Sequence, residues 1–202
     1  LTPDELHRSK GEISWNDLET MLSGFAYDAY YNHSEISRQN YFTVWDFAIN
    51  QGFSFGSGMG TNHHYGYQVR KIYTTAWLMR NAIWKAPNRD NILSTLIFWS
   101  ALQETRLLMA KTVSALLFTD ERERVRALKG LSRWVSSSLQ YTPGTIGGIK
   151  VDGTTFHHGG FYPAYTTGVL AMVGQFISLT NKTIYEPTEE ARQVLKSAFI
   201  AM

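Results

Sequence analysis

The amino-acid sequence, 202 residues long, predicts an all-α fold. Apolar residues recur with helical spacing along most of the chain, and no segment alternates convincingly between apolar and polar residues as a half-buried strand would. The expected helices are apolar on more than one side, so neighbouring helices must cover them. We therefore expect long helices in consecutive hairpins, arranged as a layered α/α array or toroid, or as a plain bundle.

Start and stop signals define the first two helices. Ser14 and Asp17 have the spacing of a capping box, and residues 15–31 follow with apolar side chains at helical intervals. Residues 67–85 place a broad apolar face on a second helix, which Pro87 ends.

The rest of the chain predicts further helices. Residues 90–118 are strongly apolar and indicate one long helix, or two with a bend near residues 104–106. Asp120 has the character of an N-cap for a helix that continues to about Leu139. Residues 163–179 and 188–202 supply two more helices.

Composition excludes several classes of protein. With 44% hydrophobic and 18% charged residues the chain is globular, and its net charge of +2 creates no strong field for nucleic acid. No apolar run is long enough to span a membrane, and the absence of cysteine excludes disulfides and thiolate metal sites. We expect one domain over residues 1–202, although this length would also fit two small ones. Both ends of the sequence look cut, so we expect a piece of a longer protein.

Aromatic residues are unusually frequent, at 14% of the sequence. Their rings fill cores, and they also stack on the apolar C–H faces of sugar rings, so a carbohydrate groove is the functional interpretation. We expect five tryptophans to serve packing rather than sugar binding, namely Trp45, Trp77, Trp84, Trp99 and Trp134.

Two glycine-rich stretches interrupt the helices, and each carries a histidine pair. Residues 52–66 include His63 and His64, and residues 144–160 include His157 and His158. Glycine permits tight turns and the close approach of a ligand, and loops on a rigid scaffold commonly carry binding groups. The repeated clustering suggests the two walls of one site. The alternative is two ordinary turns with incidental histidines.

Several familiar catalytic patterns are missing. Adjacent histidines rarely direct both imidazoles at one ion and HExxH is absent, which disfavours zinc. Gly56-Ser57-Gly58 lacks the spacing of a nucleophile elbow, and there is no Walker GKS or GKT. A glycosidase needs two facing carboxylates, and Asp46 and Asp152 are the loop-proximal candidates for this runner-up function.

A histidine with a tyrosine suits a β-elimination instead. A uronic acid sugar has a weakly acidic C5–H beside its carboxylate, and a positioned base that removes this proton expels the group at O4. Donors or cations must stabilise the enolate-like charge that develops. Tyr165 follows His158 by seven positions, and Pro163 is expected to begin a helix with Tyr165 in its first turn. The helix dipole there favours a phenolate, so we hypothesise that Tyr165 is the base.

The segment DGTTFHHGGFYPAY resembles the catalytic segment of the chondroitin and hyaluronan polysaccharide lyases, in which a DG-led loop carries the active histidine and a tyrosine follows. The short spacing from histidine to tyrosine is similar to that of the broad-specificity chondroitin sulfate ABC lyases. In the first loop, Asn62-His63-His64-Tyr65 stands where hyaluronate and AC lyases carry Asn-Trp-Trp, the aromatic patch that holds the sugar chain. The resemblance extends from about residue 40 to residue 180.

This resemblance implies an incomplete α/α toroid of helical hairpins, followed by β-sandwich domains, in a lyase that acts on chondroitin and dermatan sulfate. It implies that His158 is the catalytic histidine and that Tyr165 takes the C5 proton and protonates O4. A further histidine, matched by His63 or His64, would face the sugar from the opposite side and serve the iduronate epimer. We expect five substrate contacts in or near these motifs: Asn62, Tyr162, Tyr67, Arg70 and His157.

The sequence departs from the family in two respects. The family site also uses an arginine further along the helical domain and a glutamate from the β region, and neither has a match here, so this part alone should be nearly inactive. Hyaluronate and AC lyases bind the uronate carboxylate with an asparagine where this chain reads Gln103-Glu104-Thr105-Arg106; Arg106 could replace it, or form a surface ion pair.

The expected partners follow from the same resemblance. We expect an anionic polysaccharide as the substrate, and the missing domains of the longer protein as further partners. We expect neither nucleic acid nor a membrane as a partner. No cofactor is expected, and the sequence does not reveal a metal requirement. The family implies a periplasmic or secreted protein.

Overall fold

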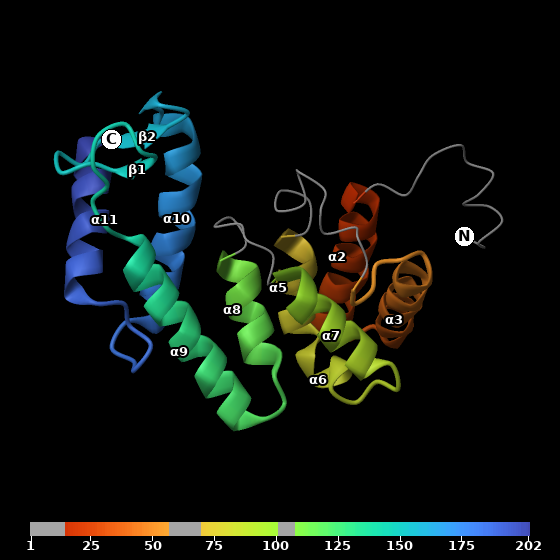
Figure 1. The fold of residues 1–202 in the computed structure, drawn as a ribbon. Helices are drawn as coiled ribbons and strands as arrows, with labels where there is room; N and C mark the ends of the chain where they lie inside the picture. The colour runs from red at the N-terminus through yellow and green to blue at the C-terminus, as the bar shows by residue number, and fades with distance from the viewer. Residues whose placement is uncertain (1–14, 57–69, 101–107) are drawn as a thin grey trace. The chain divides into compact units, whose positions relative to one another are not determined.

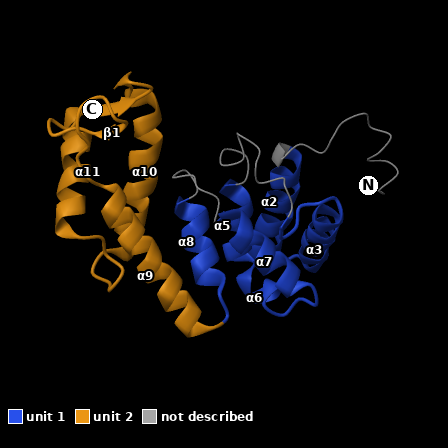
Figure 2. Cartoon of the chain, viewed as in Figure 1, with its two compact units in different colours: residues 1–119 blue, residues 120–202 orange. Residues whose placement is uncertain are grey.

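The computed structural model describes residues 15–56, 70–100 and 108–202, and these residues are mostly helical (Figure 1). The predicted all-α class is therefore confirmed. The chain divides into two compact units, residues 1–119 and 120–202 (Figure 2). The toroid and the single domain over residues 1–202 stay predictions.

The helices of the first unit pack against one another in pairs, some of them distant in the sequence. Helix α2 contacts α3 and α5, and α8 contacts α5 and α7. Their bounds are α2 Trp15–Tyr31, α3 Glu35–Asn50, α5 Arg70–Leu78, α6 Arg80–Ile83, α7 Arg89–Ser100 and α8 Leu108–Leu117.

Helix α3 is a helix that the sequence pattern did not lead us to expect. Ser34 is its N-cap, and the hydroxyl oxygen accepts a hydrogen bond of 3.2 Å from the Ser37 N–H. Tyr41, Trp45 and Ala48 then fall on its buried side at helical intervals. Aromatic and β-branched residues lower the intrinsic helix propensity of this segment, and burial of the large rings overrides that preference.

The apolar segments 67–85 and 90–118 are each divided. In the described part of the first, α5 ends at Leu78, and Met79 is the N-cap of the short helix α6. The second forms α7 and α8, which pack against one another. Its expected bend near residues 104–106 lies outside the described residues.

Aromatic rings form the centre of the first unit. The Phe53 ring lies between two fully buried tryptophans, with centroids 5.4 Å from Trp45 and 5.0 Å from Trp99. The Trp99 indole N–H donates to the Ser54 carbonyl at 3.3 Å, so its polar edge is satisfied inside the core.

The expected packing role therefore holds for most of the tryptophans. Trp77 and Trp84 are partly buried and pack against the same core. Trp134 is different, because it lies on a helix of the second unit and remains 36% exposed.

The second unit combines three helices with a small sheet. The helices agree with the predicted segments, and Asp120 caps the first of them by accepting from the N–H groups of Arg122 and Glu123 at 2.7 and 3.0 Å. The antiparallel sheet, ordered β1-β2-β3, was not predicted, because strands of two or three residues show no periodicity. The bounds are α9 Glu121–Ser138, β1 Gly148–Ile149, β2 Thr155–His157, β3 Gly160–Phe161, α10 Pro163–Thr180 and α11 Glu189–Ala201.

Candidate active site

The histidine pair of the second loop lies at the tip of a β-hairpin. His157 pairs with Gly160 in the antiparallel register of β2 and β3, so His158 and Gly159 form a two-residue connection. Both have positive φ, 53° for His158 and 80° for Gly159, which is the requirement of a type I′ turn. Glycine adopts this conformation freely. Histidine adopts it at a cost, although it is one of the side chains that tolerate it better than most.

The tyrosines come from the start of α10, directly after β3. Pro163 occupies the first turn, as predicted, and Tyr162 is the N-cap. The Tyr162 N–H donates to the Thr155 carbonyl at 3.0 Å, and the Thr166 hydroxyl donates to the Thr155 hydroxyl at 2.7 Å. These bonds fix the first turn of α10, with Tyr165 in it, to strand β2.

His157, His158, Tyr162 and Tyr165 form a cluster of four rings. The His158 and Tyr165 centroids are 6.4 Å apart, and the His157 and Tyr165 centroids are 5.4 Å apart. The centroids of the two imidazole rings are 4.0 Å apart. The two phenol rings stack with their centroids 5.1 Å apart and an interplanar angle of 30°. All four side chains are exposed, with Tyr162 at 38% and Tyr165 at 41%, so a ligand can reach them.

The other end of the hairpin is fixed against α11. A Cβ atom on Gly153 would lie 2.4 Å from the Ser197 carbonyl oxygen, so only glycine fits there. The φ of Gly153, 84°, also favours glycine. In addition, the Tyr141 hydroxyl donates to the Ser197 hydroxyl at 3.1 Å. The segment before β2 and the segment before β1 thus both contact Ser197 of α11.

Lys150 organises the loop before β2. Its ammonium group donates to the Thr142 carbonyl at 3.2 Å and to the Thr142 hydroxyl at 3.0 Å. The same group lies 4.9 Å from the centre of the Phe156 ring, within cation–π range. The supporting roles of Lys150, Thr155, Thr166 and Gly153 were not predicted from the sequence. The DG dipeptide was the one local signal that could have indicated Gly153.

The two carboxylates of the runner-up glycosidase have structural partners. Asp152 accepts from the Thr154 hydroxyl at 2.7 Å and from the Thr154 N–H at 2.9 Å. These two hydrogen bonds, the hydroxyl first, hold the pKa of Asp152 below its ordinary value. Asp46 lies in α3 rather than in a loop and accepts from the Asn88 side chain. Each carboxylate thus stabilises local structure within its own unit.

The remaining predicted site residues are not brought together with the cluster. Five of them lie outside the described residues: Asn62, His63, His64, Tyr67 and Arg106. Arg70 is the exposed first residue of α5, in the first unit. The expectation that the two glycine-rich loops form opposite walls of one site stays a prediction.

In the described part of the chain, no three histidine, cysteine, aspartate or glutamate side chains gather as metal ligands would. None of the described helices combines the length and apolar character that a membrane crossing requires.

Comparison with known proteins assigns the chain to a family. The family model described as "Lyase, catalytic" matches residues 2–202, so the chain belongs to this family of lyase catalytic domains. Among curated proteins it is 29% identical to a chondroitin sulfate ABC exolyase of Bacteroides thetaiotaomicron, over 85% of this chain and 19% of that protein. It is 27% identical to a chondroitin sulfate ABC endolyase of Proteus vulgaris, over 81% of this chain and 18% of the relative. The chain thus spans about a fifth of the length of these relatives.

Proposed function

We propose that the chain is the helical catalytic part of a polysaccharide lyase that cleaves uronate-containing glycosaminoglycans, including chondroitin and dermatan sulfate, by β-elimination. The observation that carries the proposal is the proximity of the His158 and Tyr165 rings, 6.4 Å apart on an exposed face. Membership of the lyase family and the names of the relatives support the same reaction class.

In the proposed step the Tyr165 phenolate removes the C5 proton of a uronate residue. The electron pair of the C5–H bond forms a C4–C5 double bond as the C4–O4 bond breaks, and O4 leaves with a proton returned by Tyr165. The imidazole of His158 donates a hydrogen bond in the same region and stabilises the charge that develops. Tyr165 sits in the first turn of α10, beside the imidazoles of His157 and His158.

The neighbouring rings are proposed to bind the sugar chain. Tyr162 stacks on Tyr165 and His157 lies beside both tyrosines, so together they extend the aromatic face on which sugar C–H groups can lie. In the same proposal Asn62, Tyr67 and Arg70 contact substrate, and His63 or His64 serves the epimeric uronate. The protein is proposed to act in the periplasm or outside the cell, where such polymers are found.

The test is incubation of the whole protein with chondroitin sulfate and dermatan sulfate while ultraviolet absorbance is recorded. A lyase generates a double bond conjugated to the carboxylate, so absorbance rises. New reducing ends without a rise in absorbance indicate a hydrolase. Binding of the polymer with neither new reducing ends nor a rise in absorbance indicates a carbohydrate-binding scaffold. Each of these two results overturns the proposal.

A pair of variants tests the assignment of the base. Tyr165→Phe should lower kcat by about a thousandfold, the scale of a lost general base, while oligosaccharide binding persists. Tyr162→Phe is the matched control, because it removes the hydroxyl group of the neighbouring tyrosine and keeps the aromatic ring. The centroids of the two tyrosine rings are 5.1 Å apart. If both variants lose the same small amount of activity, Tyr165 is not the base.

A further inference from the structure

Helix α9 carries more positive charge than the chain as a whole. Its sequence, ERERVRALKGLSRWVSSS, contains five basic and two acidic residues, whereas the net charge of the entire chain is only +2. The positive charge is thus concentrated on one element of the second unit, separate from the hairpin that carries His158.

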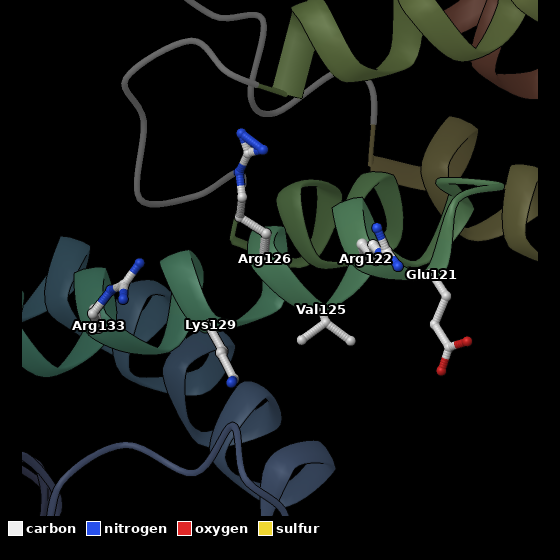
Figure 3. Close-up of a pocket in the computed structure, with 6 residues that line it drawn as sticks. All are labelled: Glu121, Arg122, Val125, Arg126, Lys129 and Arg133. Atoms are coloured by element: carbon white, nitrogen blue, oxygen red, sulfur yellow. The ribbon is translucent and has the colours of Figure 1, made fainter.

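Four of the basic residues lie along one side of α9. These residues are spaced by three or four positions, which places their side chains on one helix face. All four are exposed: Arg122, Arg126, Lys129 and Arg133. They line a common surface pocket. Figure 3 shows that the side chains spread across this face, with Arg126 and Arg133 directed toward one edge and Lys129 toward the other. At 1.5 Å per residue the row extends over about 16 Å, longer than a single sugar ring.

Most of this charge is available to a ligand. Arg126 pairs with Glu123 at 2.9 Å, and both side chains of that pair are largely exposed. Arg122, Lys129 and Arg133 form no ion pair with any of the described residues. Glu121 lines the same pocket, and with Glu123 it offsets two of the four positive charges, so the row keeps a net positive charge. Such a charge attracts an anionic polymer over about a Debye length.

An exposed aromatic ring adjoins this row. The Trp134 side chain is 36% exposed. Arg126, Gly130 and Trp134 follow one another at intervals of four positions, so they are neighbours along the helix surface. A Cβ atom on Gly130 would meet none of the described atoms within 4 Å, so the surface between Arg126 and Trp134 is open. A ring with an open approach offers a sugar a stacking face beside the cations.

We propose that Arg122, Arg126, Lys129, Arg133 and Trp134, the α9 surface, form a second binding site for the sulfated polysaccharide chain, apart from the four-ring cluster. This inference rests on the proposed function, because it takes the same polymer as the ligand. The cations bind sulfate and carboxylate groups on successive sugars, and Trp134 stacks on a ring between them. A polymer held at this surface remains attached while another segment of it reaches the catalytic hairpin, so long chains bind more tightly than short ones.

The charge pattern and the ring favour a polysaccharide over a nucleic acid. A nucleic-acid surface usually belongs to a strongly basic domain, and this chain is close to neutral overall. Tryptophan beside arginine suits a ligand that alternates anionic groups with apolar C–H faces, as a sulfated sugar chain does.

The test is the affinity of the whole protein for long chondroitin sulfate chains, measured at several salt concentrations. The triple variant Arg122→Gln, Lys129→Gln, Arg133→Gln should bind the polymer about tenfold more weakly at low salt, with a shallower salt dependence, since fewer counterions are displaced. The matched control is Lys85→Gln, Lys182→Gln, Lys196→Gln, which removes three exposed lysines outside the α9 surface and should keep the wild-type affinity. Glutamine is a good helix former, and circular dichroism checks that α9 persists.

The outcomes separate this inference from the proposed function. If the wild type cleaves a chondroitin tetrasaccharide and both triple variants bind the polymer equally well, the α9 surface is refuted and the lyase function stands. If the wild type shows no elimination but the α9 variant still loses polymer affinity relative to the control, the lyase function fails and the surface stands. The protein could instead bind duplex DNA more tightly than chondroitin sulfate, with the DNA binding lost in the α9 variant. That result would overturn the assignment of the ligand class.

Discussion

His158 has a backbone conformation that glycine adopts more easily. Its φ is 53°, and a left-handed conformation costs a non-glycine residue about 1 kcal/mol or more. We predict that His158→Gly raises the free energy of unfolding by about 0.5–1 kcal/mol while abolishing turnover of glycosaminoglycan. Urea denaturation and the absorbance assay measure the two effects separately.

The variant His158→Asn is the control for this prediction. Asparagine tolerates the left-handed region but lacks an imidazole, so stability should stay near that of the wild type and turnover should still be lost. Activity retained in either variant would remove His158 from the mechanism. A stability loss in His158→Gly would show that ring packing outweighs the backbone cost.

Gly153 is constrained by its neighbours as well as by its φ. Gly153→Ala would place a Cβ 2.4 Å from the Ser197 carbonyl oxygen, and therefore the hairpin must shift away from α11. Gly159→Ala is the matched variant, because Gly159 has a similar φ of 80° but no described atom within 4 Å of an added Cβ. We predict that both substitutions destabilise by about 1 kcal/mol through the backbone, and that Gly153→Ala costs clearly more. Equal midpoints in thermal unfolding would contradict the close contact with α11.

At the scale of elements, the interior of α9 contains a glycine that no described packing contact explains. Gly130→Ala should raise the free energy of unfolding by about 0.5–1 kcal/mol, because alanine is the better helix former and its Cβ has space. Chemical denaturation of both proteins measures the difference. A loss of stability instead would mean that this face of α9 is covered in the folded protein, which would also count against the α9 surface.

Capping and periodicity predicted the helices of the second unit well. The Asp120 cap, Pro163 at the start of α10 and the spacing of His158 to Tyr165 are all local features, so they can be recognised in the sequence. The type I′ turn could have been anticipated from the run His-His-Gly-Gly, although its strands are too short to show alternation. Helix α3 and the contact of Gly153 with Ser197 depend on distant partners, and sequence spacing alone carries no information about them.

For the whole molecule, the two units differ in the size of their cores. The first unit contains a continuous cluster of buried residues with Tyr41, Trp45, Phe53 and Trp99 fully buried at its centre. In the second unit, residues 120–202, the described buried side chains are mostly aliphatic, with Phe176 the large exception. A small unit with less buried apolar surface has less stabilisation per residue, so it should open at a lower free energy.

We predict that the second unit unfolds before the first as urea is added to the whole protein. Lyase activity, which depends on the hairpin and α10 in the proposed function, should therefore disappear at a lower urea concentration than the change in tryptophan fluorescence, because five of the six tryptophans belong to the first unit. Hydrogen exchange should show the same order, with amides of α3 and α7 protected more strongly than those of α10 and α11. A single transition that coincides for activity, fluorescence and exchange would show instead that the two units unfold as one cooperative body.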